Sequence, residues 1–463
     1  MLHRRSTALV GLSAAIAIFV VVYGALAGHG FVSDDFGWIE RSRLHSPTDL
    51  RPLVPAGNDF FRPAVALSFA VNYALFGSHP AGYGLTNVLL AVACALSLVV
   101  LLLRLGLPIG AAALGGALWL FNFHGINMAV LWLSGRTALL LTVFALATAT
   151  LVVRRRYLLA LVPLTLALLS KEEAVALPFL MGLWMMTGPR DGRPDRRAVV
   201  LWMVSSMAVL GAYLAARHYV GAMVPATAPS YYRLTFAPLD IARNILEYAD
   251  RAVTFPALIT LLAWLVLRPS PASRHADSLN LRRMACGLSW LVAGFAITIL
   301  LPVRSSLYAC LPSAGACMIA GELCRLLWVR SSDARRAVAL FAAVAVLLIA
   351  ATVHVLRADR WVELADLSTR VLDDLQGLTS KLPAGSQVVI HDGSNTRVNL
   401  RNAFGTMLED AHRLKTGRSL RIWIEPALPA LVAGGVSGPC QTCVDLELFV
   451  GRDGHVRRTP SPD

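Results

Sequence analysis

The sequence predicts an α-helical polytopic membrane protein with a small α/β domain at its C-terminal end. Three observations support this fold class. Of the 463 residues, 56% are hydrophobic and 15% are charged, whereas soluble domains average roughly 45–50% apolar and about 25% charged residues. The apolar residues gather in blocks long enough for a helix to cross a hydrocarbon layer of about 30 Å. After about residue 355 these blocks give way to short alternating segments.

We expect about eleven membrane spans. The first block follows Arg4-Arg5 and is longer than the apolar core of a signal peptide, so we interpret it as a retained span. Segments 157–170 and 173–187 are short and separated only by Lys171-Glu172, so the count could differ by one or two. The spans fall near 7–27, 85–103, 109–123, 137–153, 157–170, 173–187, 198–216, 252–267, 285–301, 306–323 and 337–354.

The net charge of +14 does not predict nucleic-acid binding, because its arginines cluster in the short gaps between alternate spans. This is the positive-inside pattern, which sets the orientation of a membrane protein. It places the N-terminus in the cytoplasm, and an odd number of spans places the C-terminus outside. We expect the inner membrane of a bacterium. The clusters are Arg154-Arg155-Arg156, Arg190–Arg197, Arg268–Arg283 and Arg325–Arg336.

Residues 1–354 therefore form the expected membrane domain and residues 355–463 an extracytoplasmic α/β domain. Alternating apolar residues predict strands, and apolar residues at helical spacing predict a helix between them. The strands are expected within Lys381–Ile390, Ser419–Ile424 and Val444–Val450, the helix at Asn399–Lys415, and a turn at Asp453-Gly454.

Seven cysteines say little about chemistry. Five lie in or beside apolar blocks, where a free cysteine behaves as a small core residue. Cys440 and Cys443 form a C-x-x-C in a polar segment. Because that segment is expected outside the cytoplasm, we favour a disulfide over a metal site.

The expected outer face has three loops whose residues are candidates for catalysis or binding, while the cytoplasmic gaps are short and basic. Loop 28–84 carries adjacent acidic residues, Asp34 and Asp35, directly after the first span. Loop 124–136 is apolar enough to dip into the membrane surface, and loop 217–250 is rich in Tyr, Arg and Pro. We therefore expect the chemistry on the outer face.

An ordered set of motifs runs through these loops and span ends: SDDF (33–36), FRP (61–63), LFG (75–77), GYGLTN (82–87), WLSGR (132–136) and SKE (170–172). The set resembles the GT-C superfamily of polyprenyl-phosphate-sugar glycosyltransferases, closest to the protein O-mannosyltransferase-like enzymes of glycosyltransferase family 39. The resemblance covers roughly residues 1–320. The chain departs from the family at Ala91, Gly125 and Met128, which leaves the subfamily and the acceptor open.

The resemblance implies an inverting transfer of a sugar from a polyprenyl monophosphate to a hydroxyl of protein, glycan or lipid. It implies a base at Asp34 or Asp35, with the first acidic residue favoured. It also implies that Arg62, Lys171 and Arg304 bind the donor phosphate. Glu172, Arg136, Trp132 and Trp38 are the candidate substrate-binding residues. Relatives differ in their need for a divalent cation, so Mg²⁺ or Mn²⁺ stays open, and no cluster has the spacing of a zinc site.

Physical chemistry supports these assignments beside plainer alternatives. Sugar transfer needs a base for the acceptor hydroxyl and cations for the departing phosphate. Two crowded carboxylates resist ionisation, which moves a pKa toward neutrality. Lys171 lies between apolar segments, where a charge is costly and therefore a functional candidate. The alternatives are a solvated loop for the aspartates, a salt bridge to Glu172 or Glu173 for Lys171, and membrane-interface anchoring for the arginines and tryptophans.

The alternative function is a transporter or flippase of a lipid-linked precursor. Transporters are often built from repeated halves with broken helices at mid-membrane, and the sequence shows no internal repeat. A purely structural anchor for the C-terminal domain would not need so many spans. Transfer chemistry is therefore favoured.

Overall fold

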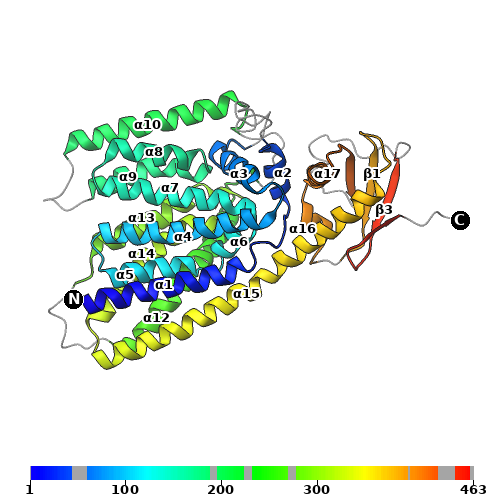
Figure 1. Ribbon diagram of the computed structural model, residues 1–463. Coiled ribbons are helices and arrows are strands. Elements are labelled where there is room, and N and C mark those ends of the chain that lie inside the picture. The colour runs from blue at the N-terminus through cyan, green and yellow to red at the C-terminus, as the bar shows by residue number, and fades with distance from the viewer. Residues whose placement is uncertain are drawn as a thin grey trace.

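The computed structural model describes residues 2–43, 60–187, 195–223, 232–268, 278–394, 397–425 and 444–458. A bundle of roughly parallel and antiparallel helices makes up most of the chain, and a smaller domain is attached at one end (Figure 1). We call the end of the bundle beside this C-terminal domain the domain end. The bundle helices are α1 (Leu2–Gly24), α4 (Pro80–Arg104), α5 (Ile109–Leu120), α6 (Gly125–Leu131), α7 (Arg136–Val153), α8 (Tyr157–Leu168), α9 (Leu177–Met186), α10 (Arg196–Tyr219), α12 (Phe255–Leu267), α13 (Leu281–Phe295), α14 (Cys310–Val329) and α15 (Asp333–Leu378).

The domain end also carries short helices. Three of them are α2 (Asp34–Arg41), α3 (Pro63–Phe76) and α11 (Pro238–Ala249). Proline stands at the start of α3 and α11, where its missing N–H costs nothing. Single-turn segments complete this end: η2 (Leu133–Gly135), η3 (Glu172–Ala176), η6 (Asp250–Thr254), η8 (Thr298–Leu300) and η9 (Ser306–Ala309).

The fold is that of an integral membrane protein. Among the described residues, seven helices are long and apolar enough to cross a membrane, and the pair α5 and α6, bent by 62°, would make eight. Each of the eleven ranges expected from the sequence contains a helix. Several of these helices are shorter than a membrane span, so the count of eleven stays a prediction.

The two ends of the bundle differ as the sequence predicts. Arg154–Arg156, Arg283 and Arg325 lie at the end opposite the C-terminal domain. There Glu322 is fully buried and binds Arg283 at 2.9 Å and Arg325 at 2.8 Å, joining α13 to α14. The acidic motif, which opens α2, and α3 lie at the domain end. The arginine-rich gaps and the candidate residues are thus on opposite sides of the bundle.

Small residues let neighbouring helices approach closely. A Cβ atom on Gly315 of α14 would lie 2.4 Å from the carbonyl oxygen of Gly287 in α13. Close approach at small residues is a common way to pack helices where lipid removes the hydrophobic driving force. The five described cysteines are buried and unpaired, which confirms their prediction as core residues.

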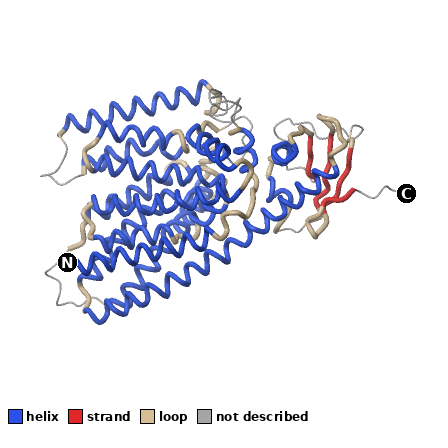
Figure 2. The backbone as a smooth tube through the Cα atoms, in the orientation of Figure 1, coloured by secondary structure: helices blue, strands red, loops and turns tan. Residues whose placement is uncertain are grey.

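The C-terminal domain contains a four-stranded sheet beside the end of α15 and two short helices (Figure 2). The strand order is β2-β1-β3-β4, with β1 parallel to β2 and β3, and β4 antiparallel to β3. The predicted strands and turn are confirmed, and the predicted helix is divided at Gly405. The elements are β1 (Gln387–Asp392), α16 (Leu400–Phe404), α17 (Leu408–Thr416), β2 (Arg421–Glu425), β3 (Leu446–Val450) and β4 (Val456–Arg458). Cys440 and Cys443 lie outside the described residues.

The domain boundary expected at 354/355 falls inside a helix. α15 continues without a break from the bundle into the C-terminal domain. One apolar cluster also joins the two parts: Phe36 of α2 and Phe69 of α3 pack in the same core as Leu367, Val388 and Phe404. The acidic segment and the C-terminal domain therefore form one packed unit at the domain end.

This arrangement predicts the topology of the chain in the membrane. A reporter inserted between Thr187 and Asp195 and a second one fused after Arg458 should report opposite sides, because the two points lie at opposite ends of the bundle. From the arginine distribution, the first should be cytoplasmic and the second extracytoplasmic. Protease protection or compartment-specific reporter activity measures this. Both reporters on one side would contradict the arrangement.

Candidate active site

Helix α2 begins directly after the strained residue Ser33. Ser33 has φ of 54° and ψ of −123°, a conformation that costs a non-glycine residue about 1–3 kcal/mol and survives only where the surroundings enforce it. Its N–H donates to the carbonyl oxygen of Ala403 in α16 at 2.7 Å. Asp34 and Asp35 follow in the first turn of α2, where the helix dipole favours negative charge.

Asp35 is fully buried and bound on both carboxylate oxygens. Oδ1 accepts hydrogen bonds from the backbone N–H and the hydroxyl of Ser134, at 2.7 and 2.6 Å, and Oδ2 accepts from the N–H of Val32 at 3.0 Å. Burial raises the pKa of Asp35 to about 7, against the opposing effect of these donors. With both oxygens held by protein, Asp35 is a structural carboxylate that fastens α2 to η2.

Asp34 is partly exposed and is the freer of the two acids. The Ser33 hydroxyl approaches its Oδ1 at 3.4 Å. Burial raises the pKa of Asp34, and the nearby charges of Arg41 and Arg62 only partly offset this effect. A carboxylate with a raised pKa beside a cation has the properties of a general base. The geometry therefore favours Asp34 for this role.

Arg62 and Arg217 share one carboxylate, that of Glu172. Arg62 donates from Nε at 3.3 Å and from Nη2 at 2.8 Å to the two oxygens of Glu172, and its guanidinium lies 4.3 Å from the centre of the Phe60 ring. Arg217 donates to Glu172 at 3.0 Å and to the hydroxyl of Tyr213 at 2.9 Å. Burial alone would raise the pKa of Glu172, but the two arginines hold it at about 2. Two cations around one anion leave this part of the site positive.

Lys171 pairs with the neighbouring acid. Its Nζ lies 2.7 Å from Oε1 of Glu173, and both side chains are buried. The ammonium group also lies 4.6 Å from the centre of the Tyr308 ring. The partner of Lys171 is thus Glu173, while Glu172 serves Arg62 and Arg217.

Arg304 lies between η8 and η9. Its Nε donates to Oδ1 of Asn244 at 2.8 Å, and Glu247 and Asp240 of α11 are 3.6 and 3.9 Å away. Its side chain is 21% exposed. Arg304 is therefore held by α11 while part of its guanidinium stays accessible.

Arg136 does not have the geometry of a substrate-binding residue. It is fully buried, and its guanidinium donates to Oδ1 of Asn87, to Ser68 and to the carbonyl oxygen of Tyr83. It also stacks over Phe69, 4.4 Å from the ring centre. All these donors are directed at protein atoms, so the structure corrects the sequence-based assignment: Arg136 joins α3, α4 and α7.

The two candidate tryptophans stack on protein rings. Trp38 lies parallel to Phe69 with 5.8 Å between ring centres, and Trp132 lies parallel to Trp361 of α15 at 6.3 Å. Both are half-buried. Their role in sugar binding stays a prediction.

A continuous polar set emerges from these pairs. The charge of Arg62 lowers the pKa of Asp34, and the charge of Glu173 raises the pKa of Arg62. The ring of Tyr308 lies beside Lys171 and packs edge-on against Tyr248. Sequence reasoning missed Arg217, although an arginine at a span end that is expected outside the cytoplasm runs against the positive-inside pattern and is a usable signal. It also missed Tyr308 and Asn244. The members of this polar set are Asp34, Arg62, Lys171, Glu172, Glu173, Arg217, Tyr248, Arg304 and Tyr308.

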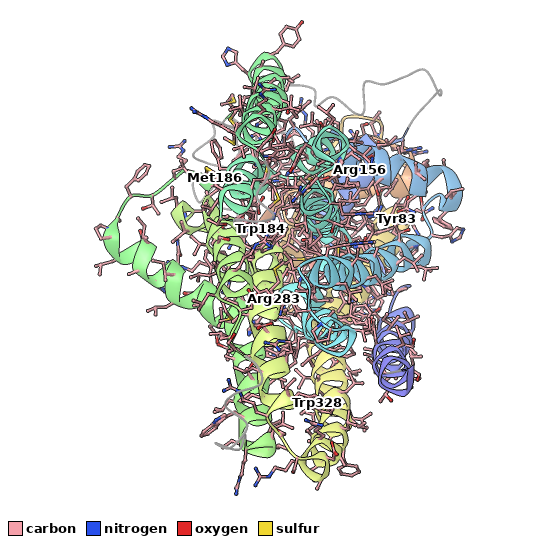
Figure 3. The ribbon with its side chains drawn as sticks, turned by 90° about the vertical axis from the view of Figure 1, so that its left-hand side faces the viewer. Tyr83, Arg156, Trp184, Met186, Arg283 and Trp328 are labelled. Atoms are coloured by element: carbon pink, nitrogen blue, oxygen red, sulfur yellow. The ribbon has the colours of Figure 1, made fainter. Side chains whose placement is uncertain are left out.

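The opposite end of the bundle offers a different environment. Figure 3 looks along the bundle from that end, where Arg283 is visible. A cavity of about 610 Å³ there is lined by Arg283, Arg325 and Asn280. Both arginines bind Glu322, and none of the site residues predicted from the sequence lines this cavity. Within the described residues no group of three or more His, Cys, Asp or Glu side chains could hold a metal ion.

The comparisons with known proteins identify the fold. No family model matches the sequence, and no curated protein matches it significantly. The structure resembles that of ArnT from Cupriavidus metallidurans bound to undecaprenyl phosphate, with a TM-score of 0.52 and 14% identity over 95% of this chain and 92% of that one. The apo structure of the same ArnT gives a TM-score of 0.52 and 15% identity over 92% and 87% of the chains. The likeness to these two structures confirms the predicted fold, a helical membrane bundle with a small C-terminal sheet domain.

The two adjacent aspartates should respond differently to substitution. Asp35→Asn puts an NH₂ group where Oδ2 accepts the Val32 N–H, and an unsatisfied buried donor of this kind costs about 1–3 kcal/mol. We expect a lower unfolding temperature for Asp35→Asn in thermal denaturation of the purified protein. Asp34→Asn is the matched control and should unfold near the wild-type temperature. Equal unfolding temperatures for the two variants would contradict the structural role of Asp35.

Proposed function

We propose that the protein is an inverting glycosyltransferase that moves a sugar from a polyprenyl-phosphate donor to a hydroxyl acceptor at the outer membrane face. The observation that carries the proposal is a partly exposed carboxylate, Asp34, within the electrostatic influence of Arg62, which shares Glu172 with Arg217 at one end of an ArnT-like bundle. A base and a cationic phosphate site are the two requirements of this chemistry. One of the ArnT structures holds undecaprenyl phosphate, which supports a polyprenyl-linked donor for this chain.

In this mechanism Asp34 removes the proton from the acceptor hydroxyl. The hydroxyl oxygen then forms a bond to the anomeric carbon of the sugar, and the bond from that carbon to the phosphate oxygen breaks with its electron pair on the phosphate. Attack opposite the leaving group inverts the anomeric centre. The products are the glycosylated acceptor and the polyprenyl phosphate, and the proton stays on Asp34 until it passes to solvent.

The arginines would stabilise the charge that develops on the leaving phosphate. Arg62 uses Nε and Nη2 for Glu172, and within the described part of the chain its Nη1 has no hydrogen-bond partner. The donor phosphate would bind there, close to Asp34. Lys171 and Arg304 lie further along the same polar set, each beside an acidic partner, and would offer further hydrogen-bond donors to the phosphate. Pre-placed donors of this kind lower the barrier because they need no reorganisation during the reaction.

The finer assignments are also proposals. The sugar is a hexose or a pentose, with a mannosyltransferase-like specificity suggested by the sequence motifs. The acceptor is a hydroxyl of a protein, a glycan or a lipid. The extracytoplasmic face of a bacterial inner membrane is the expected location. The transporter alternative is less favoured, because the candidate charges gather at one end of the bundle and the sequence shows no internal repeat.

Transfer by purified protein tests the proposal. Polyprenyl-phosphate sugars of defined identity are supplied with membrane extracts as the acceptor source, and labelled sugar is followed into protein, glycan and lipid. In Asp34→Asn the side chain keeps its size but loses its proton acceptor, so turnover should fall by about 10²–10⁴ while donor binding is kept. Arg62→Gln is the comparison variant and should weaken donor binding as well. Near-normal transfer by both Asp34→Asn and Asp35→Asn would sink the catalytic role of the acidic motif.

The pH dependence follows from the surroundings of Asp34. A base works only when it is deprotonated, so turnover should fall as the pH drops through the pKa of Asp34. Burial raises this pKa above the ordinary value of 3.8, and Arg41 lowers it. Arg41→Gln removes the lowering charge, so the acid limb of the kcat profile should move to higher pH. Arg43→Gln, which removes a partner of Glu40 instead, should leave the limb in place. A shift to lower pH for Arg41→Gln would refute the assignment of the limb to Asp34.

A further inference from the structure

The C-terminal domain carries none of the candidate catalytic or phosphate-binding residues, yet it contacts the segment that does. Phe31 and Gly30 run along α15: the carbonyl oxygen of Phe31 accepts a hydrogen bond from the Ser368 hydroxyl at 2.7 Å, and a Cβ on Gly30 would lie 3.1 Å from Cβ of Ala365. Val32 and Phe36 belong to the same apolar cluster as Leu367 and Phe404. The acidic segment is thus packed into the core of the C-terminal domain.

Contacts from α16 reach the residue before the proposed base. The carbonyl oxygen of Ala403 accepts the N–H of Ser33 at 2.7 Å. Gly405 has φ of 54°, and a Cβ there would lie 2.9 Å from Oγ of Ser33. The rings of Phe36 and Phe404 stack with 5.7 Å between their centres. The strained backbone of Ser33 is therefore held by the C-terminal domain at the point where the chain turns into α2.

Contacts from α17 hold the other end of α2. Nε of Arg413 donates to Oε1 of Glu40 at 2.9 Å. A Cβ on Gly37 would lie 2.8 Å from the sulfur of Met407, so the two helices meet with no room for a side chain. Glu40 is largely buried, with 14% of its side chain exposed. The C-terminal domain thus contacts α2 both at its start and in its last turn.

We propose that the C-terminal domain is a positioning element for the reaction, and that Ala403, Phe404 and Arg413 hold α2 in the conformation that presents Asp34 to the phosphate-binding arginines. This role rests on the proposed function of Asp34, because positioning matters only if that carboxylate acts. Asp35, fastened to Ser134, fixes α2 to the bundle, and the C-terminal domain fixes its opposite side. Asp34 lies between the two anchors.

The test compares two ion pairs made by α17 in the full-length protein, one through Arg413 and one through Lys415. Arg413→Gln breaks the pair with Glu40, whereas the control Lys415→Gln breaks the 2.7 Å pair with Asp373 of α15, which does not involve α2. Without this hydrogen bond between charged groups, local unfolding of α2 should become at least about tenfold more frequent. Amide hydrogen exchange of a peptide covering residues 31–41 should therefore speed up about tenfold in Arg413→Gln and stay at the wild-type rate in Lys415→Gln.

Kinetics then separate positioning from general stability. We expect kcat of Arg413→Gln to fall about tenfold with KM for the donor changed less than about twofold, and Arg413→Lys to restore most of the rate. Glu40 also pairs with Arg43, and Arg413 also pairs with Asp410. In the double variant Glu40→Gln with Arg413→Gln, the fold-loss of rate should therefore be smaller than the product of the two single losses, because the pair between Glu40 and Arg413 is lost in both single variants.

The outcomes distinguish the two proposals. If wild-type protein transfers sugar and Arg413→Gln exchanges its 31–41 amides at the wild-type rate, or exchanges them faster with unchanged kcat, the positioning role is refuted. An equal loss of kcat in Lys415→Gln would also refute it, since the effect would then be general destabilisation. If wild-type protein transfers none of the supplied polyprenyl-phosphate sugars, the proposed function fails, and with it the catalytic part of this inference, while the exchange rates still decide whether the domain holds α2.

Discussion

The carboxylate of Asp35 accepts three hydrogen bonds from two parts of the chain that are about a hundred residues apart. The arrangement of the rest of the domain end depends on this contact between α2 and η2. Its bonds to Ser134 fix α2 against η2, and η2 leads directly into Arg136 at the start of α7. Arg136 in turn binds Asn87 of α4 and Ser68 of α3. Buried polar networks in which every member is satisfied make the surrounding structure rigid. A fixed Asp35 therefore holds its neighbour Asp34 in place, while among the described residues the carboxylate of Asp34 accepts a hydrogen bond only from the Ser33 hydroxyl, at 3.4 Å.

The helices of the bundle could be predicted from the sequence because apolar blocks and arginine-rich gaps are local features. The same holds for the first three strands of the C-terminal domain. The continuity of α15 was missed for a physical reason: the surroundings of the helix change near residue 355, from the bundle to the domain end, while its helical spacing does not. Leu364, Leu367, Val371 and Leu375 keep one buried face along its second half. A change in composition marks a change of environment and need not mark the end of a helix.

The site was predicted in part, and the misses share one cause. Sequence motifs indicated Asp34, Arg62 and Lys171, which the structure places in one polar set. They favoured Asp34 over Asp35 by resemblance alone, because the physical difference is a partner, Ser134, that lies far away in the chain. They also suggested an exposed role for Arg136, since a motif gives no information on burial. Arg217 shares Glu172 with Arg62 only after α10 has crossed the bundle. Residue types can be read locally, but the pairing of charges depends on tertiary contacts.

The way the C-terminal domain is attached determines how much freedom the acidic segment has. A domain joined to a bundle by one helix alone would be free to tilt as that helix bends at the membrane edge. Here there is a second connection, because α2 is packed between the bundle and the domain. The strained backbone of Ser33, which costs about 1–3 kcal/mol, can persist only if contacts on both sides offset it. The hydrogen bond from Ser33 to Ala403 on one side and those to Asp35 on the other supply such contacts. If either side were removed, α2 would be free to relax toward an unstrained conformation. The geometry around Asp34 is therefore a property of the whole chain, including a region that contributes no reacting group.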